Sequence, residues 1–224
     1  MIDQLIIGEK ASFDDFGASV ASRVIKQPKK KTIKETVPFS NVTYDFSAIN
    51  GEVYWEEREI DYEFEITASS PEKLEQAKIA FANWIMNVID EEIFDPFIPD
   101  YHFKGTFADM DFADEDNVEK TTATVKFAVY PYKISNYPSI YEIELLTGEK
   151  KPLVVTNDSS HRITPTIITN GAIAMEIGLT TYTISAGTYE DSAIKLPVGT
   201  TSLMIENKSG KNCAVQVKFI EEVF

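Results

Sequence analysis

Hydrophobic and polar side chains alternate strictly from Glu59 to Thr67. The apolar positions are Ile60, Tyr62, Phe64 and Ile66, and the acidic positions are Glu59, Asp61, Glu63 and Glu65. Because successive side chains of a strand point to opposite faces, this period of two predicts a half-buried strand with an acidic outer face.

A helix over about residues 71–89 is the one helix that the pattern predicts. Ser70 supplies an N-cap hydroxyl, Pro71 fits the first turn, and Glu72 lies near the positive end of the helix dipole. Apolar residues then recur at spacings of three and four, at Leu74, Ala77, Phe81, Trp84, Ile85 and Val88. We expect this stripe to pack on a sheet.

The other expected elements of the first half are strands and an arm. Ile6–Ile7 suggests a short strand, and the two prolines of residues 24–38 suggest an extended arm or long hairpin. A second hairpin is expected at Asn50–Gly51, between strands near Tyr44 and at Val53–Trp55. Two later strands, 101–108 and 118–130, flank an acidic turn at 109–117.

From Ser139 onward the chain carries less charge and shows no helical pattern. Short strand candidates are 163–168, 172–177, 180–186, 193–196, 202–206 and 213–220, with turn residues between them. This spacing favours an antiparallel β-sandwich. We therefore expect a mainly β protein of two domains, 1–137 and 138–224, with Pro131 and Pro138 bracketing the boundary.

The chain of 224 residues has a net charge of −15, distributed as −12 over residues 1–137 and −3 over 138–224. An acidic surface argues against nucleic-acid binding. The exception is a basic run of Lys26, Lys29, Lys30, Lys31 and Lys34, with Arg23 close by. We interpret the run as a solvated or inter-subunit segment facing an acidic neighbouring copy, with a polyanion contact as the alternative.

Candidate chemistry is sparse. His161 has Asp158, Ser159 and Ser160 beside it, but a catalytic triad converges in space and adjacency in a loop is a common accident. The elbow, P-loop, dinucleotide and zinc-protease motifs are all absent from the sequence. We expect no enzyme, no catalytic residue and no cofactor, and a hydrolase using carboxylates stays open only because acids are plentiful.

Four further features allow limited statements. Asp109, Asp111, Asp114 and Asp116 form either a solvated turn or a weak cation site, and no metal site is assigned. Trp55 is either an exposed contact or a strand residue, and Cys213 is expected on a buried strand. The acidic N-terminus and short apolar runs predict no signal peptide and no membrane span, so the protein is expected to stay in the cytoplasm where it is made.

The order of features resembles the distal tail (Dit) proteins of long-tailed phages and prophages, especially those of Gram-positive hosts. The carrying segments are the Ile/Phe-rich start, the basic arm, Tyr54–Ile60, Ser70–Glu72, Tyr101–Gly105 and Phe127–Lys133. Residues 138–224 resemble the galectin-like or carbohydrate-module-like sandwich of that family, through Gly178–Tyr182, Leu196–Gly199 and Leu203–Ile205.

The resemblance implies a structural protein of the virion tail tip, made in the bacterial cytoplasm. It implies that residues 1–137 form a ring, in that family a hexamer, on the tail tube, with the lysine run between subunits. Partners would be other copies, the tail tube protein, proteins linked to the tape measure, and a receptor-binding protein docked on 138–224. The alternative is a carbohydrate-binding module, which the few aromatic residues of 138–224 do not favour.

Overall fold

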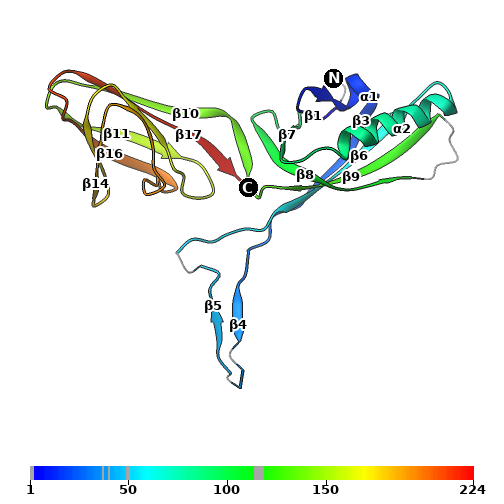
Figure 1. Cartoon of the computed structure of the whole chain (residues 1–224), viewed down its shortest axis with the longest axis horizontal. Helices are drawn as coiled ribbons and strands as arrows, with labels where there is room; N and C mark the ends of the chain where they lie inside the picture. Colours follow the sequence, from blue (N-terminus) through cyan, green and yellow to red (C-terminus); the bar gives the residue numbers. More distant parts are fainter. Residues whose placement is uncertain (1–2, 37, 40, 49–50, 114–118) are drawn as a thin grey trace. The chain divides into compact units, whose positions relative to one another are not determined.

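The computed structural model describes residues 3–36, 38–39, 41–48, 51–113 and 119–224, and it divides into two compact units (Figure 1). Unit 1 is Met1–Lys133 together with Phe224, and unit 2 is Ile134–Val223. Both units consist mainly of antiparallel strands, so the predicted fold class is confirmed.

Unit 1 is built on one antiparallel sheet with the strand order β3-β6-β9-β8-β7-β1-β2. The strands are β3 (Ala18–Ile25), β6 (Arg58–Thr67), β9 (Lys120–Val129), β8 (Tyr101–Phe112), β7 (Glu91–Phe94), β1 (Ile6–Ile7) and β2 (Lys10–Ala11). Two helices, α1 (Ser12–Phe16) and α2 (Pro71–Ile85), lie on one face of this sheet (Figure 1).

The strand β6 has the alternation that the sequence predicted. Its four apolar side chains are fully buried, while the acidic ones lie on the other face. Phe81 of α2 packs against Phe64 of β6, with their ring centroids 5.0 Å apart, and Trp84 stacks on Phe16 of α1 at 4.7 Å. The predicted apolar stripe of the helix therefore covers the sheet.

The predicted helix is four residues too long at its C-terminal end, since α2 ends at Ile85 rather than near residue 89. Its N-terminus is as expected, with the Ser70 side chain accepting a hydrogen bond from the Lys73 amide. Beyond Ile85, the Val88 amide donates to the Ile85 carbonyl and the chain turns, so Val88 still reaches the core without being helical. The short α1 was not predicted.

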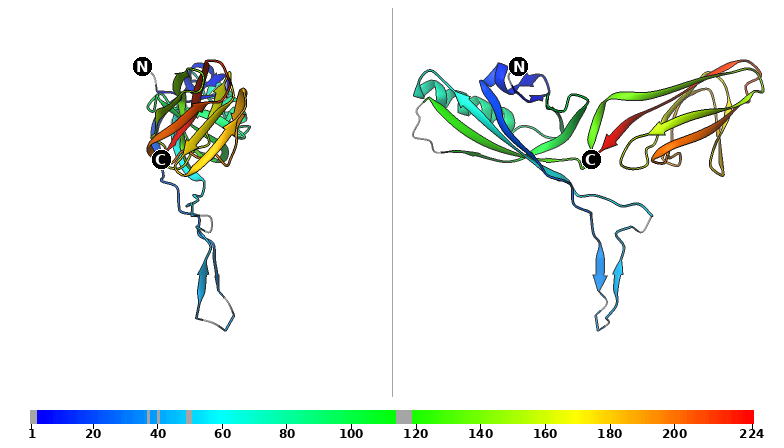
Figure 2. Two further views of the ribbon diagram at one scale, coloured as in Figure 1. Left: turned by 90° about the vertical axis from the view of Figure 1, so that its left-hand side faces the viewer. Right: turned by 180° about the vertical axis from the view of Figure 1, so that it is seen from behind.

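The expected arm is present, but its hairpin pairs differently from the prediction. The strand β4 (Lys34–Thr36) pairs with β5 (Thr43–Asp45), and Val53–Trp55 forms no strand. Residues 54–56 instead return beside the lysine run, because the Lys31 amide donates to the Tyr54 carbonyl and the Glu56 amide to the Lys29 carbonyl. Asn50, half of the predicted turn, lies outside the described residues. The arm, residues 26–57, leaves unit 1 after β3 and returns at β6 (Figure 2).

The strand β8 continues four residues beyond its predicted end at Ala108 and takes in the first acidic residues of the expected turn. The strand β8 runs through Phe112, and Asp109 and Asp111 face Lys126 and Thr124 of β9. Residues 109–112 of the expected turn are therefore part of a strand. Asp114 and Asp116 lie outside the described residues.

Unit 2 consists of two antiparallel sheets that enclose one hydrophobic core (Figures 1 and 2). One sheet has the order β15-β12-β17-β10 and the other the order β11-β16-β13-β14. Their bounds are β10 (Lys133–Leu145), β11 (Lys150–Asn157), β12 (Thr166–Thr169), β13 (Ile173–Ile177), β14 (Thr180–Ile184), β15 (Gly187–Glu190), β16 (Gly199–Asn207) and β17 (Cys213–Val223). The core contains Cys213, as expected for a buried strand residue.

Three strands of unit 2, β10, β11 and β15, were not predicted. The first of them runs through Pro138, and the units divide after Lys133, between the two prolines expected to bracket the boundary and four residues before the predicted division after Tyr137. The predicted strand 193–196 is reduced to a single bridge between Ile163 and Leu196. This segment is a loop, and the side chains of Ile194 and Leu196 are buried in the core.

Replacing Phe81 by Ala should lower the free energy of unfolding by about 3–5 kcal/mol, because the ring is fully buried and its removal leaves a cavity. Met86 is 57% exposed, one residue beyond the same helix, so Met86→Ala should cost less than about 0.5 kcal/mol. Urea unfolding of the two variants measures both values. Equal losses would show that α2 does not cover the sheet as described.

Candidate functional site

The arm is the surface whose exposed residues most clearly indicate an interaction with a partner. Seven of its large apolar side chains are exposed: Ile33, Phe39, Val42, Tyr44, Phe46, Val53 and Tyr54. In addition, β4 and β5 pair only with each other among the described residues, and all their residues are exposed. Contiguous exposed apolar surface on a soluble domain marks an interaction site.

The five lysines assigned to this region separate into two groups. Lys26 binds Glu59 at 2.7 Å and Asp61 at 3.2 Å, and Lys34 lies 4.0 Å from Asp45. The hydrogen bond from Lys26 lowers the pKa of Glu59, and the bonds to Glu59 and Asp61 raise the pKa of Lys26. These two lysines are therefore used within the chain.

The other group is Lys29, Lys30 and Lys31. All three are exposed, and within the described part of the chain none of them lies within 4.0 Å of a carboxylate. Their backbones are fixed, since Lys30 bridges Trp55 and the neighbouring amides and carbonyls bond to residues 54 and 56. Three positive charges are thus held on an ordered segment and directed at solvent.

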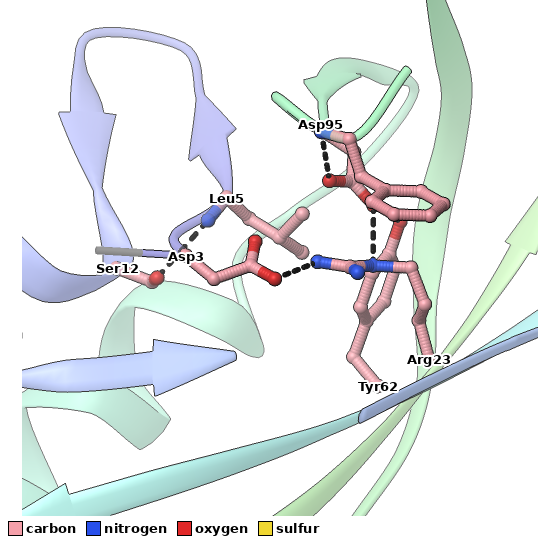
Figure 3. Close-up of polar contacts among 7 residues, drawn as sticks. Asp3, Leu5, Ser12, Arg23, Tyr62 and Asp95 are labelled. Atoms are coloured by element: carbon pink, nitrogen blue, oxygen red, sulfur yellow. Dashed lines mark hydrogen bonds and ion pairs between the residues drawn. The ribbon is translucent and has the colours of Figure 1, made fainter. Parts of the chain in front are cut away.

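A buried ion pair anchors the strand from which the arm begins (Figure 3). Arg23 Nε of β3 lies 2.9 Å from Asp95 Oδ2, and Arg23 Nη2 donates to Asp3 Oδ2 at 2.5 Å. The Asp95 side chain is 1% exposed and the Arg23 side chain 15%. The Phe97 ring covers the guanidinium at 4.6 Å, and the Phe97 amide donates to Asp95 Oδ1.

Tyr62 completes this cluster from β6. Its hydroxyl donates to Asp95 Oδ2 at 3.1 Å, and it pairs with Arg23 in the β3–β6 register. Burial, followed by the negative charge of Asp95, raises the pKa of Tyr62 well above its usual value. Burial alone would lower the pKa of Arg23, but the hydrogen bond to Asp3 and the charge of Asp95 outweigh burial and raise it.

The returning end of the arm is held by an aromatic cluster of unit 1. The Trp55 ring meets the Phe224 ring edge-on at 4.8 Å, and Phe224 lies 4.9 Å from Tyr132. Gln27 and Pro28 join Trp55 and Phe224 around a small, mostly apolar pocket. Trp55 is thus a packing residue at the base of the arm. The sequence had allowed either an exposed contact or a strand residue at this position.

Arg58, directly after the arm, is buried to 1% exposure. Its Nε donates to the Pro131 carbonyl at 2.7 Å, Nη2 donates to the same oxygen, and its guanidinium lies over the Phe103 ring. Burial lowers the pKa of Arg58. Both ends of the arm are therefore fixed to the unit 1 sheet by arginine side chains.

The other candidate residues lie apart from the arm. His161 faces Glu222 at 3.1 Å in unit 2, and the Ser159 hydroxyl accepts a hydrogen bond from the Glu222 amide, so this group fastens a loop to β17. Asp109 pairs with Lys126 at 3.2 Å. No cluster of ligands suited to a metal ion occurs among the described residues, and neither described helix has the length and apolarity needed to cross a bilayer.

The role of Arg23 was missed from the sequence, which placed it with the basic run. A β-bulge between Val20 and Ser22 shifts the alternation of β3, so that Ala18 and Val20 point inward before it and Arg23 after it. One signal in the sequence could have indicated an inward-facing Arg23. It lies two residues before the apolar Ile25, and residues two apart in a strand point to the same face. The partner Asp95 is 72 positions away, and nothing in the sequence connects the two.

Replacing Arg23 by Met should lower the free energy of unfolding by about 3–5 kcal/mol, because Asp95 would keep its charge in a buried site without its partner. Lys26→Met removes a solvent-exposed pair of the same strand region, and its loss should be far smaller than that of Arg23→Met because solvent screens the exposed charges. Chemical denaturation at pH 7 compares the two variants. A small loss for Arg23→Met would mean that the ion pair does not hold β3.

Tyr62 should make the protein less stable in alkali. A phenol whose pKa is raised by folding stabilises the fold fully below its unfolded pKa of 10.0, and this stabilisation declines as the pH rises above that value. The decline is at most about 1.4 kcal/mol per pH unit for one group. Tyr62→Phe should lose about 1 kcal/mol at pH 7 and show a shallower decline from pH 10 to 11. Parallel slopes would place Tyr62 in a solvated environment.

Comparison with solved structures identifies the fold. The chain is similar to SPP1 Dit, described as a paradigm of the hub adsorption apparatus in phages that infect Gram-positive bacteria, with a TM-score of 0.68 and 14% identity over 98% of this chain and 100% of that one. Chains of the phage P2 baseplate, in its activated conformation with Ca and with Sr, give TM-scores of 0.39 and 0.44 at 10% and 9% identity, covering 97% and 98% of this chain and 98% of each of those. No protein-family model and no curated protein sequence matches. The first comparison shows that this chain has the fold of the SPP1 Dit protein, as the sequence resemblance predicted.

Proposed function

We propose that this chain is a structural hub protein of a phage tail tip, which assembles into a ring between the tail tube and the proteins that bind the host. The observation that carries the proposal is the arm, an extension with exposed apolar side chains and three exposed lysines that form no ion pair among the described residues, on a chain with the SPP1 Dit fold.

The arm is the element that joins neighbouring copies. A closed ring brings two different surfaces of each protomer together, so one copy's arm can lie on the body of the next. Its apolar side chains would lose their contact with water there, and Lys29, Lys30 and Lys31 would meet carboxylates of a chain with a net charge of −15. Lys26 and Lys34 have their own partners and serve to shape the arm.

The outer face of the unit 1 sheet suits the water-filled channel of such a ring. Six carboxylates, Glu59, Asp61, Glu63, Glu65, Asp109 and Asp111, project from β6 and β8, against three lysines, Lys26, Lys120 and Lys126. A face so rich in charge gains little from packing against protein. Its negative excess would also repel nucleic acid that passes through, which keeps the channel from binding its contents.

Unit 2 is proposed as the docking domain. The alternative role, a carbohydrate-binding module, relies on aromatic rings that stack on sugars. Two shallow grooves of about 370 and 470 Å³ occur along β10, β12 and β17, and neither has an aromatic residue in its lining. Binding of protein partners is therefore the better use of this unit, and a glycan array with the full chain would reverse that preference if it showed selective binding.

Replacing Lys29, Lys30 and Lys31 together by Glu should weaken ring assembly by at least tenfold in concentration, because three attractions to an acidic neighbour become repulsions. Light scattering across a concentration series, with negative-stain images of the same fractions, measures the assembled fraction. Assembly on purified tail tubes is the second readout, since ring closure can require that template.

The control variant carries the same change of charge elsewhere. Lys195, Lys208 and Lys211 of unit 2 are exposed, and their replacement by Glu alters the net charge equally without touching the arm. Its assembly should match the unchanged protein. If the arm variant assembles as well as this control, on its own and on tubes, the lysines are not an inter-subunit contact.

A further inference from the structure

The two edge strands of one sheet of unit 2 differ in whether they carry residues that oppose the pairing of a further strand. In the sheet β11-β16-β13-β14, the strand β11 opens with Lys150, Lys151 and Pro152. Lysine and proline on an edge strand discourage pairing with a further strand. The opposite edge, β14, has the sequence Thr180-Thr181-Tyr182-Thr183-Ile184 and carries no such residue.

The absence of charge extends well beyond β14. All thirteen residues from Ile177 to Tyr189 are uncharged and none is proline, in a chain of which 25% is charged. The stretch covers β14, the connection Ser185–Ala186 and most of β15, the edge strand of the other sheet. Leu179, in the turn before β14, is fully exposed, and all four residues of β15 are exposed.

The backbone of β14 offers hydrogen bonds on its open side. Among the described residues its only ladder partner is β13, in a continuous register from Ile173↔Ile184 to Ile177↔Thr180, and its Tyr182 hydroxyl donates to the Ala193 carbonyl of the loop after β15. In an antiparallel pair only alternate residues direct their amide and carbonyl groups at the partner strand, so the remaining groups of β14 point outward. Threonine, tyrosine and isoleucine are also residues that favour strand pairing.

We propose that β14 is a docking edge, which accepts an extended, uncharged strand from a different protein of the tail tip by adding it to the sheet. The inference rests on the proposed function, because it names how the docking unit holds its partner. Main-chain hydrogen bonds supply the affinity in this mode of recognition. The partner strand should lack charges, because a charged side chain would lose hydration beside thirteen residues that offer it no counter-charge.

A second copy of this chain does not suit the edge. Pairing β14 with β14 of another copy requires a two-fold axis between them, which a head-to-tail ring does not contain. Pairing it with the other edge of the sheet would place a partner against Lys150, Lys151 and Pro152. The occupant is therefore a strand from another protein.

Hydrogen exchange tests the proposal directly. Exchange of the backbone amides in 178–186 is compared between the isolated full chain and tails purified from the phage or prophage that encodes it, with 150–157 as the internal reference. The outward amides of β14 should exchange at least tenfold more slowly in the tails, and those of β11 should not change. Absence of the chain from purified tails would overturn the proposed function together with this inference. Its presence with unchanged β14 exchange would overturn the inference alone.

A pair of variants connects the protection to this edge. Thr181→Lys with Thr183→Lys places two charges on exposed positions of β14, and Val154→Lys places one on β11, where Val154 is 55% exposed. In tails, the first variant should return β14 exchange to the rate of the isolated chain, and the second should keep the protection. Protection that survives Thr181→Lys with Thr183→Lys would contradict strand addition.

Discussion

The contact role proposed for the arm requires a fixed root, and the buried ion pair between Arg23 and Asp95 is the interaction that holds the strand at that root. The arm grows out of β3 and returns into β6, two strands that pair with each other, so its two ends are already neighbours. Arg23 fixes β3 to the segment after β7, while Arg58 fixes the start of β6 to Pro131. A buried pair contributes little net stability, but it strongly penalises arrangements that separate the two charges. Specific placement, rather than stability, is what this pair provides.

How far the sequence predicted the structure depended on whether the controlling interaction was local. The alternation of β6 and the N-cap of α2 involve neighbouring residues, and both were predicted correctly. The pairing of the arm was not, because the Asn50–Gly51 signal competed with contacts between residues 29–31 and 54–56. The same limit hid the anchor, where a bulge in β3 reversed the inward side and the partner lay 72 positions away. Of the five lysines assigned to a contact, structure alone separated Lys26 and Lys34, which form ion pairs, from the three that form none with the carboxylates of the described residues.

The exposed surfaces of the two units differ in the chemical groups that they offer to a partner. The arm combines apolar side chains with positive charge, so it selects an acidic surface that can also cover hydrophobic groups. The β14 edge has neither charge nor a large apolar patch and offers main-chain groups instead. Because these chemistries do not substitute for each other, a partner suited to one surface gains little at the other. In the proposed hub, ring closure and docking would therefore not compete for one surface.

Net charge adds a constraint on when association can occur. Copies with a charge of −15 repel each other at long range, and at physiological salt this repulsion is screened beyond about 8 Å. Attraction between an arm and its target acts only within contact distance, where screening is weakest. Under the proposed function, two free chains would meet this repulsion first, and the arm's contacts would prevail only once a copy is held in register. A template such as the proposed tail tube would supply that register, so an acidic body would favour assembly on the template over aggregation in solution.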